Sequence, residues 1–426
     1  MYEIANNEDS QPTQDRLATL IKRIFQNRNL GLLWFGQMAS QSGDSIYQIG
    51  LLWITLELTG SESVTGLVAM ASYLPAVILS LLAGVVADRF NRLRVMIFAD
   101  ATRLLLVLAV PMLALFDGIT PLFLGINAFA IAIAATFFNP ARDAIVPQIV
   151  PEARLVRANS LIQTSWQLSM LIGPGIAGWV LFYFGKIPLF WAAAATYALS
   201  LGTILAMRVS SPKSALAEVK EPSSRISWAD ILHGLRFAVR HKVIGPLLLI
   251  TIADNIFIMG PAIVGTPVFI KNDLRLGADS FALIEGCYAI GMLIGTGLLL
   301  GLGKHLPKGK VLLVGMVLDG ITFIPIFWVE SLLALEITII VHSLAIPMLT
   351  VTRASLIQSL VPREMTGQIF ALVNIAVVGM SAISAGLAGI ALEAFGARYL
   401  FFSIGIGGGL CGVAGWIWAR ELRASK

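Results

Sequence analysis

A few carboxylates stand in stretches of the sequence that are otherwise almost free of charge. The candidates are Asp44, Asp254, Glu285 and Asp319. Ionisable groups are costly to bury in apolar segments, so those that persist mark binding or proton-transfer sites by default. Asp44 and Asp254 are the stronger candidates for binding a proton or substrate, with a structural ion pair as the alternative for each. Asp44 is favoured as the proton-coupling group, because Tyr47 and Gln48 follow it where Phe257 and Ile258 follow Asp254. Glu285 and Asp319 rank below them.

Other polar groups in these stretches favour a structural role. Asp100 and Arg103 are three residues apart, so they can pair with each other in a helix. His342 could titrate near neutral pH, but a hydrogen-bonded packing histidine is the more frequent case. Cys287 and Cys411 fall inside apolar runs and indicate neither a disulfide framework nor a metal site. We therefore expect no metal and no cofactor.

The stretches around these residues have the length and composition of membrane-spanning helices. The 426-residue chain is 57% hydrophobic and 13% charged, whereas soluble proteins carry about a quarter charged residues. Apolar runs of about 20 residues, enough to cross a hydrocarbon core of about 30 Å, recur along it. The sequence predicts an all-α membrane protein with twelve transmembrane helices, near residues 30–57, 64–87, 95–116, 119–139, 156–183, 187–208, 243–270, 279–303, 310–329, 332–352, 365–393 and 397–419.

The second half of the chain repeats the first. Residues 141–151 match residues 352–362 at a fixed offset, and in a register one residue different Asp44 matches Asp254. Such a repeat indicates two pseudo-symmetric six-helix bundles joined by a divergent linker. The expected order is a tail with an amphipathic helix, a first bundle, a linker with an amphipathic helix, a second bundle and a short tail, over residues 1–29, 30–209, 210–242, 243–420 and 421–426.

Lysine and arginine residues fall mainly on one side of this arrangement. If both termini are cytoplasmic, 25 of them lie on the cytoplasmic side and 4 on the other, with Arg103 inside a helix. Positive charge stays on the cytoplasmic side of membrane proteins, so the sequence predicts cytoplasmic N and C termini. No cleavable signal peptide is visible before the first apolar run.

The turn after the second predicted helix combines a glycine, an acid and several bases. Gly84, Asp88, Arg89 and Arg92 match the signature loop of the major facilitator superfamily, Gly-x-x-x-Asp-Arg-x-Gly-Arg-Arg, with Asn91 in place of its second glycine. The chain resembles that superfamily. The resemblance implies two bundles that rock about a central cavity, with this loop locking one conformation. A positively charged anchor is the alternative for the loop.

A second resemblance narrows the branch. Residues 138–147 and 157–161 are similar to the efflux branch that includes macrolide exporters and enterobactin-type siderophore exporters. Arg142 and Asp143 in the first stretch, and Arg353 in its repeat, are candidates for gating. Anchoring at the ends of their helices is the alternative.

The predicted fifth helix carries a Gly-Pro-Gly-Ile-Ala-Gly run. Its Gly173, Pro174 and Gly178 resemble the antiporter motif of drug–proton exchangers. This resemblance implies exchange rather than uniport. Close packing of neighbouring helices is the other explanation for such small residues.

Together these features predict a secondary active transporter and not an enzyme. We expect it to export an amphipathic small molecule, either a drug-like compound or a siderophore, by proton antiport. It should act as a monomer in the bilayer of the bacterial inner membrane, without nucleic acid. No Gly-x-x-x-x-Gly-Lys-Ser/Thr loop occurs, so an ion gradient must supply the energy. The alternatives are a lipid or lysolipid flippase and, from another class, a non-transporting receptor or scaffold. Weaker candidates for the cavity lining are Trp53, Tyr73, Trp166 and Gln167.

Reporter fusions should establish the orientation that the charge distribution predicts. A reporter that is active only outside the cytoplasm should be active after Asp117, Lys186 or Glu330 and silent after Arg92 or Lys220. The opposite pattern at any two of these sites would contradict the twelve-helix arrangement.

Overall fold

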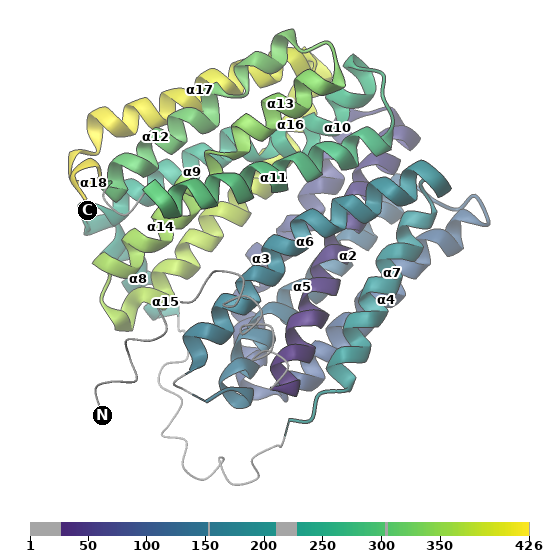
Figure 1. Cartoon of the computed structure of the whole chain (residues 1–426), viewed down its shortest axis with the longest axis horizontal. Helices are drawn as coiled ribbons and strands as arrows, with labels where there is room; N and C mark the ends of the chain where they lie inside the picture. The colour runs from purple at the N-terminus through teal and green to yellow at the C-terminus, as the bar shows by residue number, and fades with distance from the viewer. Residues whose placement is uncertain (1–26, 152–153, 210–227, 303–305, 426) are drawn as a thin grey trace.

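The computed structural model describes residues 27–151, 154–209, 228–302 and 306–425, and nearly all of them are helical (Figure 1). Eleven helical segments within these ranges are long and apolar enough to cross a membrane. The first long helix, α2 (Arg28–Thr59), is more polar because Gln37, Ser40 and Asp44 interrupt it. With α2, each half of the described chain has six long helical segments, in agreement with the predicted all-α, two-bundle membrane fold.

The first half consists of uninterrupted helices whose ends follow local sequence signals. Asn27 and Ser61 accept hydrogen bonds from backbone N–H groups in the first turns of α2 and α3. Gly60 ends α2 with a φ of 61°, which glycine adopts without strain. The remaining helices are α3 (Glu62–Arg89), α4 (Arg92–Ala114), α5 (Pro121–Ile149), α6 (Leu155–Phe184) and α7 (Pro188–Leu205).

The second half contains broken helices, and proline, which cannot donate a backbone hydrogen bond, stands at several of the breaks but not at η6. Pro261 opens a π-helical turn within the first span, and Pro347 follows a break in the fourth. The segments are α9 (Ile244–Gly260), η2 (Pro261–Gly265), α10 (Thr266–Val268), η3 (Phe269–Asp273), α11 (Ala278–Leu302), α12 (Lys308–Ile321), η5 (Ile324–Trp328), α13 (Leu332–Ser343), α14 (Ile346–Leu360), α15 (Arg363–Asn374), η6 (Ile375–Gly379), α16 (Met380–Phe395), α17 (Ala397–Trp418) and α18 (Arg420–Ala424).

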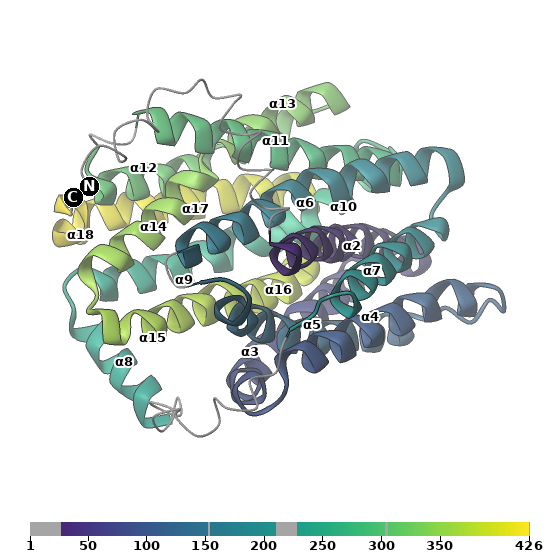
Figure 2. The same cartoon turned by 60° about the horizontal axis from the view of Figure 1, so that its bottom comes forward.

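A short helix precedes the second half. The amphipathic helix predicted after Ser227 is present as α8 (Trp228–Arg240). It packs against α15, where a Cβ on Gly234 would lie 3.0 Å from Oε1 of Gln368 (Figure 2). The predicted N-terminal amphipathic helix and residues 210–227 of the linker lie outside the described residues.

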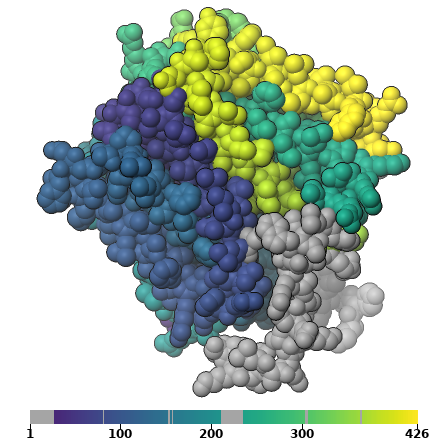
Figure 3. All heavy atoms as spheres, turned by 180° about the vertical axis from the view of Figure 1, so that it is seen from behind, coloured from purple at the N-terminus to yellow at the C-terminus, as the bar shows by residue number. Residues whose placement is uncertain are grey.

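The two halves meet at one end of the molecule and spread apart at the other. We call the end that carries the start of α2 and the helix α18 the near end, and the end that carries the turns at Gly60 and Gly396 the far end. In Figure 1 the helices of the two halves converge towards the far end and diverge towards the near end. The opposite face shows the purple and yellow-green surfaces of the two halves in contact (Figure 3).

Glycines allow the two halves to touch backbone to backbone at the far end. A Cβ added to Gly66 of α3 would lie 2.8 Å from Cα of Gly389 of α16. Such close approach replaces the hydrophobic driving force that helices lack in lipid. A side chain at either position would separate α3 from α16.

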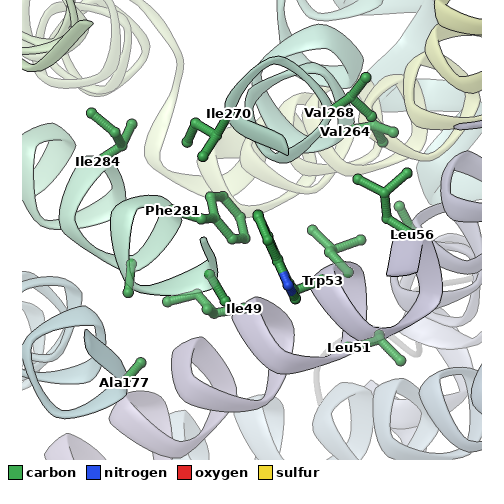
Figure 4. Packing of buried hydrophobic residues seen from close by; sticks show 14 of the residues in the cluster. Ile49, Leu51, Trp53, Leu56, Ala177, Val264, Val268, Ile270, Phe281 and Ile284 are labelled. Carbon is green, nitrogen blue, oxygen red and sulfur yellow. The ribbon is translucent and has the colours of Figure 1, made fainter. Parts of the chain in front are cut away.

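Polar and aromatic contacts complete this far-end contact. Nζ of Lys271 donates to the carbonyl of Leu56 at 2.8 Å, and Nδ2 of Asn272 donates to Oε1 of Glu62 at 2.8 Å. Trp53 of α2 stacks on Phe281 of α11 with ring centroids 6.3 Å apart (Figure 4). The hydroxyl of Ser61 adds a hydrogen bond to Oε2 of Glu393 at 3.4 Å at the same end. The structure is therefore closed at the far end and parted at the near end.

Candidate functional site

A buried arginine organises the polar cluster of the first half. Arg103 of α4 is 2% exposed. Its Nη1 donates to Oγ of Ser40 at 3.0 Å, lies 3.5 Å from Oδ1 of Asp100, and lies 3.9 Å from Oδ1 of Asp44. The predicted pairing of Asp100 with Arg103 is present. The same guanidinium also reaches Asp44, so the ion pair considered as the alternative for Asp44 exists in this conformation.

Two hydroxyl groups from α7 complete this cluster. The Tyr197 hydroxyl donates to Oδ1 of Asp44 at 2.7 Å, and the Ser200 hydroxyl donates to Oδ2 of Asp100 at 2.5 Å. The Arg103 guanidinium also lies over the Tyr197 ring, 5.8 Å from its centroid. Both carboxylates are thus hydrogen-bonded, and the cluster ties α2, α4 and α7 together. The side chain of Asp44 remains 43% exposed, so one side of it is accessible.

The second half contains a different cluster, built around a histidine. Oδ1 of Asp319 on α12 lies 3.7 Å from Nε2 of His342 on α13, and both side chains are buried. Nδ1 of His342 is 2.9 Å from Oγ1 of Thr322. The imidazole packs against the Phe323 ring, with centroids 4.0 Å apart, and meets Tyr288 of α11 edge-on at 5.7 Å. The histidine is therefore held in place by packing while one ring nitrogen faces a carboxylate.

Asp254 extends this cluster towards the near end. It is 7% exposed, and its Oδ1 has no hydrogen-bond partner among the residues that the structure describes. It is close enough to Asp319 and to Arg353 of α14 to interact with both electrostatically. Asp254 and its counterpart Asp44 therefore have different surroundings, because Oδ1 of Asp44 accepts a hydrogen bond from Tyr197 and Oδ1 of Asp254 accepts none in the described chain.

Glu285 lies where the two halves face each other. It stands on α11, and Tyr73 of α3 in the other half is within electrostatic range of it. In the described chain, the Glu285 carboxylate makes no hydrogen bond or ion pair. Far-end residues close the space beside it, with Trp53 stacked on Phe281 (Figure 4). The junction thus offers one free carboxylate among apolar and aromatic side chains.

A family model for the Major Facilitator Superfamily matches residues 33–376 and 247–426, which together cover most of the chain. The chain belongs to the Major Facilitator Superfamily.

Relatives within the superfamily include efflux proteins. The chain is 30% identical over 225 residues to the multidrug efflux pump Tap of Mycolicibacterium fortuitum, over 51% of this chain and 54% of that protein. It is 27% identical over 145 residues to macrolide efflux protein A of Streptococcus pyogenes, over 34% of this chain and 36% of that protein. It is 24% identical over 372 residues to the uncharacterized MFS-type transporter YvqJ of Bacillus subtilis, over 87% of each. The chain spans about half the length of Tap.

Solved structures share the fold. A D-xylose–proton symporter has a TM-score of 0.72 at 15% identity, covering 95% of this chain and 99% of its own. An inward-facing, unoccupied bacterial homologue of the human lysosomal transporter Spinster has a TM-score of 0.70 at 13% identity, covering 92% and 97%. At these identities the likeness shows the fold alone. The chain is therefore a multi-pass membrane protein of a transporter superfamily, similar to its drug-efflux members.

The major facilitator signature loop is exposed in this conformation. Asp88 and Arg89 are exposed, and Asp88 makes no hydrogen bond or ion pair with any residue in the described ranges. Nε of Arg92 donates to the carbonyl of Ala87 at 3.4 Å. A Cβ on Gly84 would meet nothing within 4 Å, so the close helix approach expected at this glycine is absent here. The loop has acidic and basic groups that could bond to the other half, and in the described chain none of them forms a hydrogen bond or ion pair with it.

The repeated arginines have diverged. Arg142 lies 2.8 Å from the adjacent Asp143 and donates to Asn139 at 3.0 Å, all within α5. Its counterpart Arg353 interacts across helices with Asp254. The gating roles of Arg142, Asp143 and Arg353 stay predictions.

The glycines that resemble the antiporter motif are packing positions in this structure. A Cβ on Gly173 would lie 2.7 Å from Cβ of Ser45, which brings α6 against α2. A Cβ on Gly178 would lie 3.6 Å from Cβ of Ala282, across the junction with α11. Pro174 lies between them inside α6. The motif therefore lies on the helix that packs against both α2 and the second half.

Several residues of these clusters were not singled out from the sequence. Tyr197, Ser200, Thr322 and Tyr288 are polar residues on buried helix faces. Their only signal is a polar side chain in an apolar span, which serines and threonines give frequently because they bond to their own backbone. In the described chain, no group of three or more histidine, cysteine, aspartate or glutamate residues could hold a metal ion.

Loss of the Asp88 carboxylate should slow transport without lowering protein levels. Asp88 is exposed and unpaired here, so its contribution belongs to the conformation in which the near end closes. Lowering the stability of that conformation by about 1.4 kcal/mol would shift the equilibrium between it and the present conformation about tenfold. We expect Asp88→Asn to reduce the rate of ethidium efflux from cells by about that factor.

Asp117→Asn is the matched control, because Asp117 is an exposed loop acid at the far end. It should transport like the unmodified protein. Equal transport by Asp88→Asn at equal protein level would show that Asp88 has no part in the conformational cycle.

Proposed function

We propose that this protein exports amphipathic small molecules from the cytoplasm in exchange for protons. The observation that carries the proposal is the junction between the halves, where Glu285, which has no bonded partner within the described chain, and Tyr73 lie among apolar side chains and the far end is closed. A carboxylate in such surroundings suits a solute that has an apolar body and a polar or cationic group. Similarity to Tap and to macrolide efflux protein A supports an efflux direction.

The contacts at the far end are of a kind that can open. They are a glycine-to-glycine contact, a stacked aromatic pair and a few hydrogen bonds, beside a buried apolar cluster to which both halves contribute. Rocking the halves would part these contacts and bring the near ends together, where Asp88 and the neighbouring arginines are free to pair. This motion exposes the junction to each side of the membrane in turn.

Proton exchange is the part of the proposal that rests on the buried acids. Asp44, Asp254, Glu285 and Asp319 all lie within or beside the helix spans. Carboxylates in such places form proton relays in pumps and transporters, because each can change its charge when it meets water from one side.

The orientation follows from the charge distribution. The near end, with the start of α2 and with α18, would face the cytoplasm, because 25 of the 30 lysines and arginines fall on that side. In this assignment residues 30–209 and 243–420 are the two bundles, and residues 210–242 form the cytoplasmic linker. The setting would be the bacterial inner membrane, with one chain as the working unit.

A vesicle assay tests this function directly. Inside-out membrane vesicles that contain the protein should accumulate ethidium, an amphipathic cationic dye, when the lumen is made acidic. Nigericin, which collapses the pH difference, should abolish the accumulation. Vesicles without the protein supply the baseline.

The same vesicles separate the alternatives. Accumulation that ignores nigericin would contradict proton antiport. Preferential accumulation of a fluorescent lysolipid over ethidium would favour a flippase. Metabolite profiles of the medium from cells with and without the protein would then distinguish a siderophore from other exported compounds.

A further inference from the structure

The clusters of the two halves differ in how completely their acids are satisfied. In the first half, Arg103 and the hydroxyls of Tyr197 and Ser200 bind both carboxylates at hydrogen-bond or ion-pair distance. In the second half, Oδ1 of Asp254 has no partner among the described residues, and Asp319 faces only an imidazole at 3.7 Å. Buried polar groups are normally paired, so the buried carboxylate that lacks a hydrogen-bond donor is the one placed to accept a further proton.

The side chains of the second cluster form a series that runs across the second half. Arg353 and Asp254 lie towards the near end, and Asp254 is within electrostatic range of Asp319. Asp319 faces His342, whose ring meets Tyr288. Tyr288 stands one turn after Glu285 on α11, and three-residue spacing puts both on one face of that helix. The series therefore connects the junction with the near end.

We propose that Asp254, Asp319 and His342 carry the transported proton, and that Tyr288 connects this site with Glu285 at the junction. This assignment rests on the proposed proton antiport. It makes the first cluster, with Asp44 and Arg103, a fixed structural element that holds α2, α4 and α7 together.

The step is a proton transfer and nothing else. A proton from water bonds to a carboxylate oxygen of Asp319 or Asp254, or to Nε2 of His342. The same O–H or N–H bond breaks when the proton returns to water on the opposite side. Thr322, at 2.9 Å from Nδ1, keeps the ring oriented so that Nε2 faces Asp319. Substrate that neutralises Glu285 changes the field at Tyr288 and the histidine, which links substrate binding to proton release.

Charged or titratable groups face this site from each element packed around it. They are Asp254 from α9, Glu285 and Tyr288 from α11, Asp319 from α12, His342 from α13, Arg353 from α14 and Cys411 from α17. Arg353 is the one permanent cation among them in the described chain, and it interacts with Asp254. Asp319 has only the histidine beside it, so the net charge of this site depends on whether a proton is bound.

Two transport modes in the same vesicles test the assignment. Uphill accumulation of ethidium under a pH step needs proton transfer, whereas exchange of ethidium at equal concentrations on both sides needs only the rocking of the halves. We expect Asp319→Asn and His342→Gln to lower uphill accumulation at least about tenfold while exchange stays within about twofold. Asp319→Glu, which keeps a titratable group, should recover uphill accumulation.

Thr338→Val is the matched control, because Thr338 lies one turn before His342 and bonds only to its own helix at Ala334. It should retain both modes. If Asp319→Asn does not reach the membrane, His342→Gln decides the matter, since it keeps an amide at the same place.

Three outcomes contradict the inference. Uphill accumulation by both variants at the unmodified level shows that the proton travels elsewhere. Equal loss of both modes, with Thr338→Val intact, shows a structural role only. An unmodified protein that ignores the pH step contradicts the proposed function itself, and the assignment with it.

Discussion

The cost of an unpaired polar group in hydrocarbon is the constraint on which this structure depends. Every backbone group in the spans must be satisfied within the protein, so the spans are helices and breaks occur where other helices cover them. The same cost applies to side chains. Arg103 is nearly fully buried, and four oxygen-bearing side chains gather around it: Ser40, Asp44, Asp100 and Tyr197. This cluster holds three helices together because none of its charges could remain alone in lipid.

The second half uses the same constraint differently. Asp254 and Asp319 are buried, but Oδ1 of Asp254 has no hydrogen-bond partner in the described chain and Asp319 faces a histidine. A buried carboxylate without a full set of partners costs free energy, and this cost is larger when the carboxylate is ionised than when it is protonated. Glycine contacts such as Gly66 with Gly389 then let the halves move as bodies, since small residues permit close contact that does not depend on interlocking side chains. The paired cluster of the first half and the incompletely paired acids of the second half are thus two responses to the same cost of burying polar groups.

Local features could be predicted from the sequence, and contacts between distant helices could not. The Asp100–Arg103 pair follows from helical spacing, and α8 follows from its polar and apolar pattern. The duplication indicated two bundles and matched Asp44 with Asp254, but it did not show that these two aspartates have different partners. Tyr197 bonds Asp44 across 153 positions of sequence, and no comparable hydroxyl bonds Asp254 in the described chain. Such differences arise from which helix faces which, and one-dimensional spacing carries no information about that.

We propose that the halves rock between a closed far end and a closed near end. Pairs of spin labels would test it in nanodiscs, with Cys287 and Cys411 replaced by serine. One pair would use exposed far-end positions, Leu67→Cys with Ile390→Cys, and the other exposed positions towards the near end, Gln163→Cys with Leu298→Cys. The account predicts that the far-end distance lengthens as the near-end distance shortens when the pH or substrate changes. Two distances that stay fixed, or that lengthen together, would contradict it.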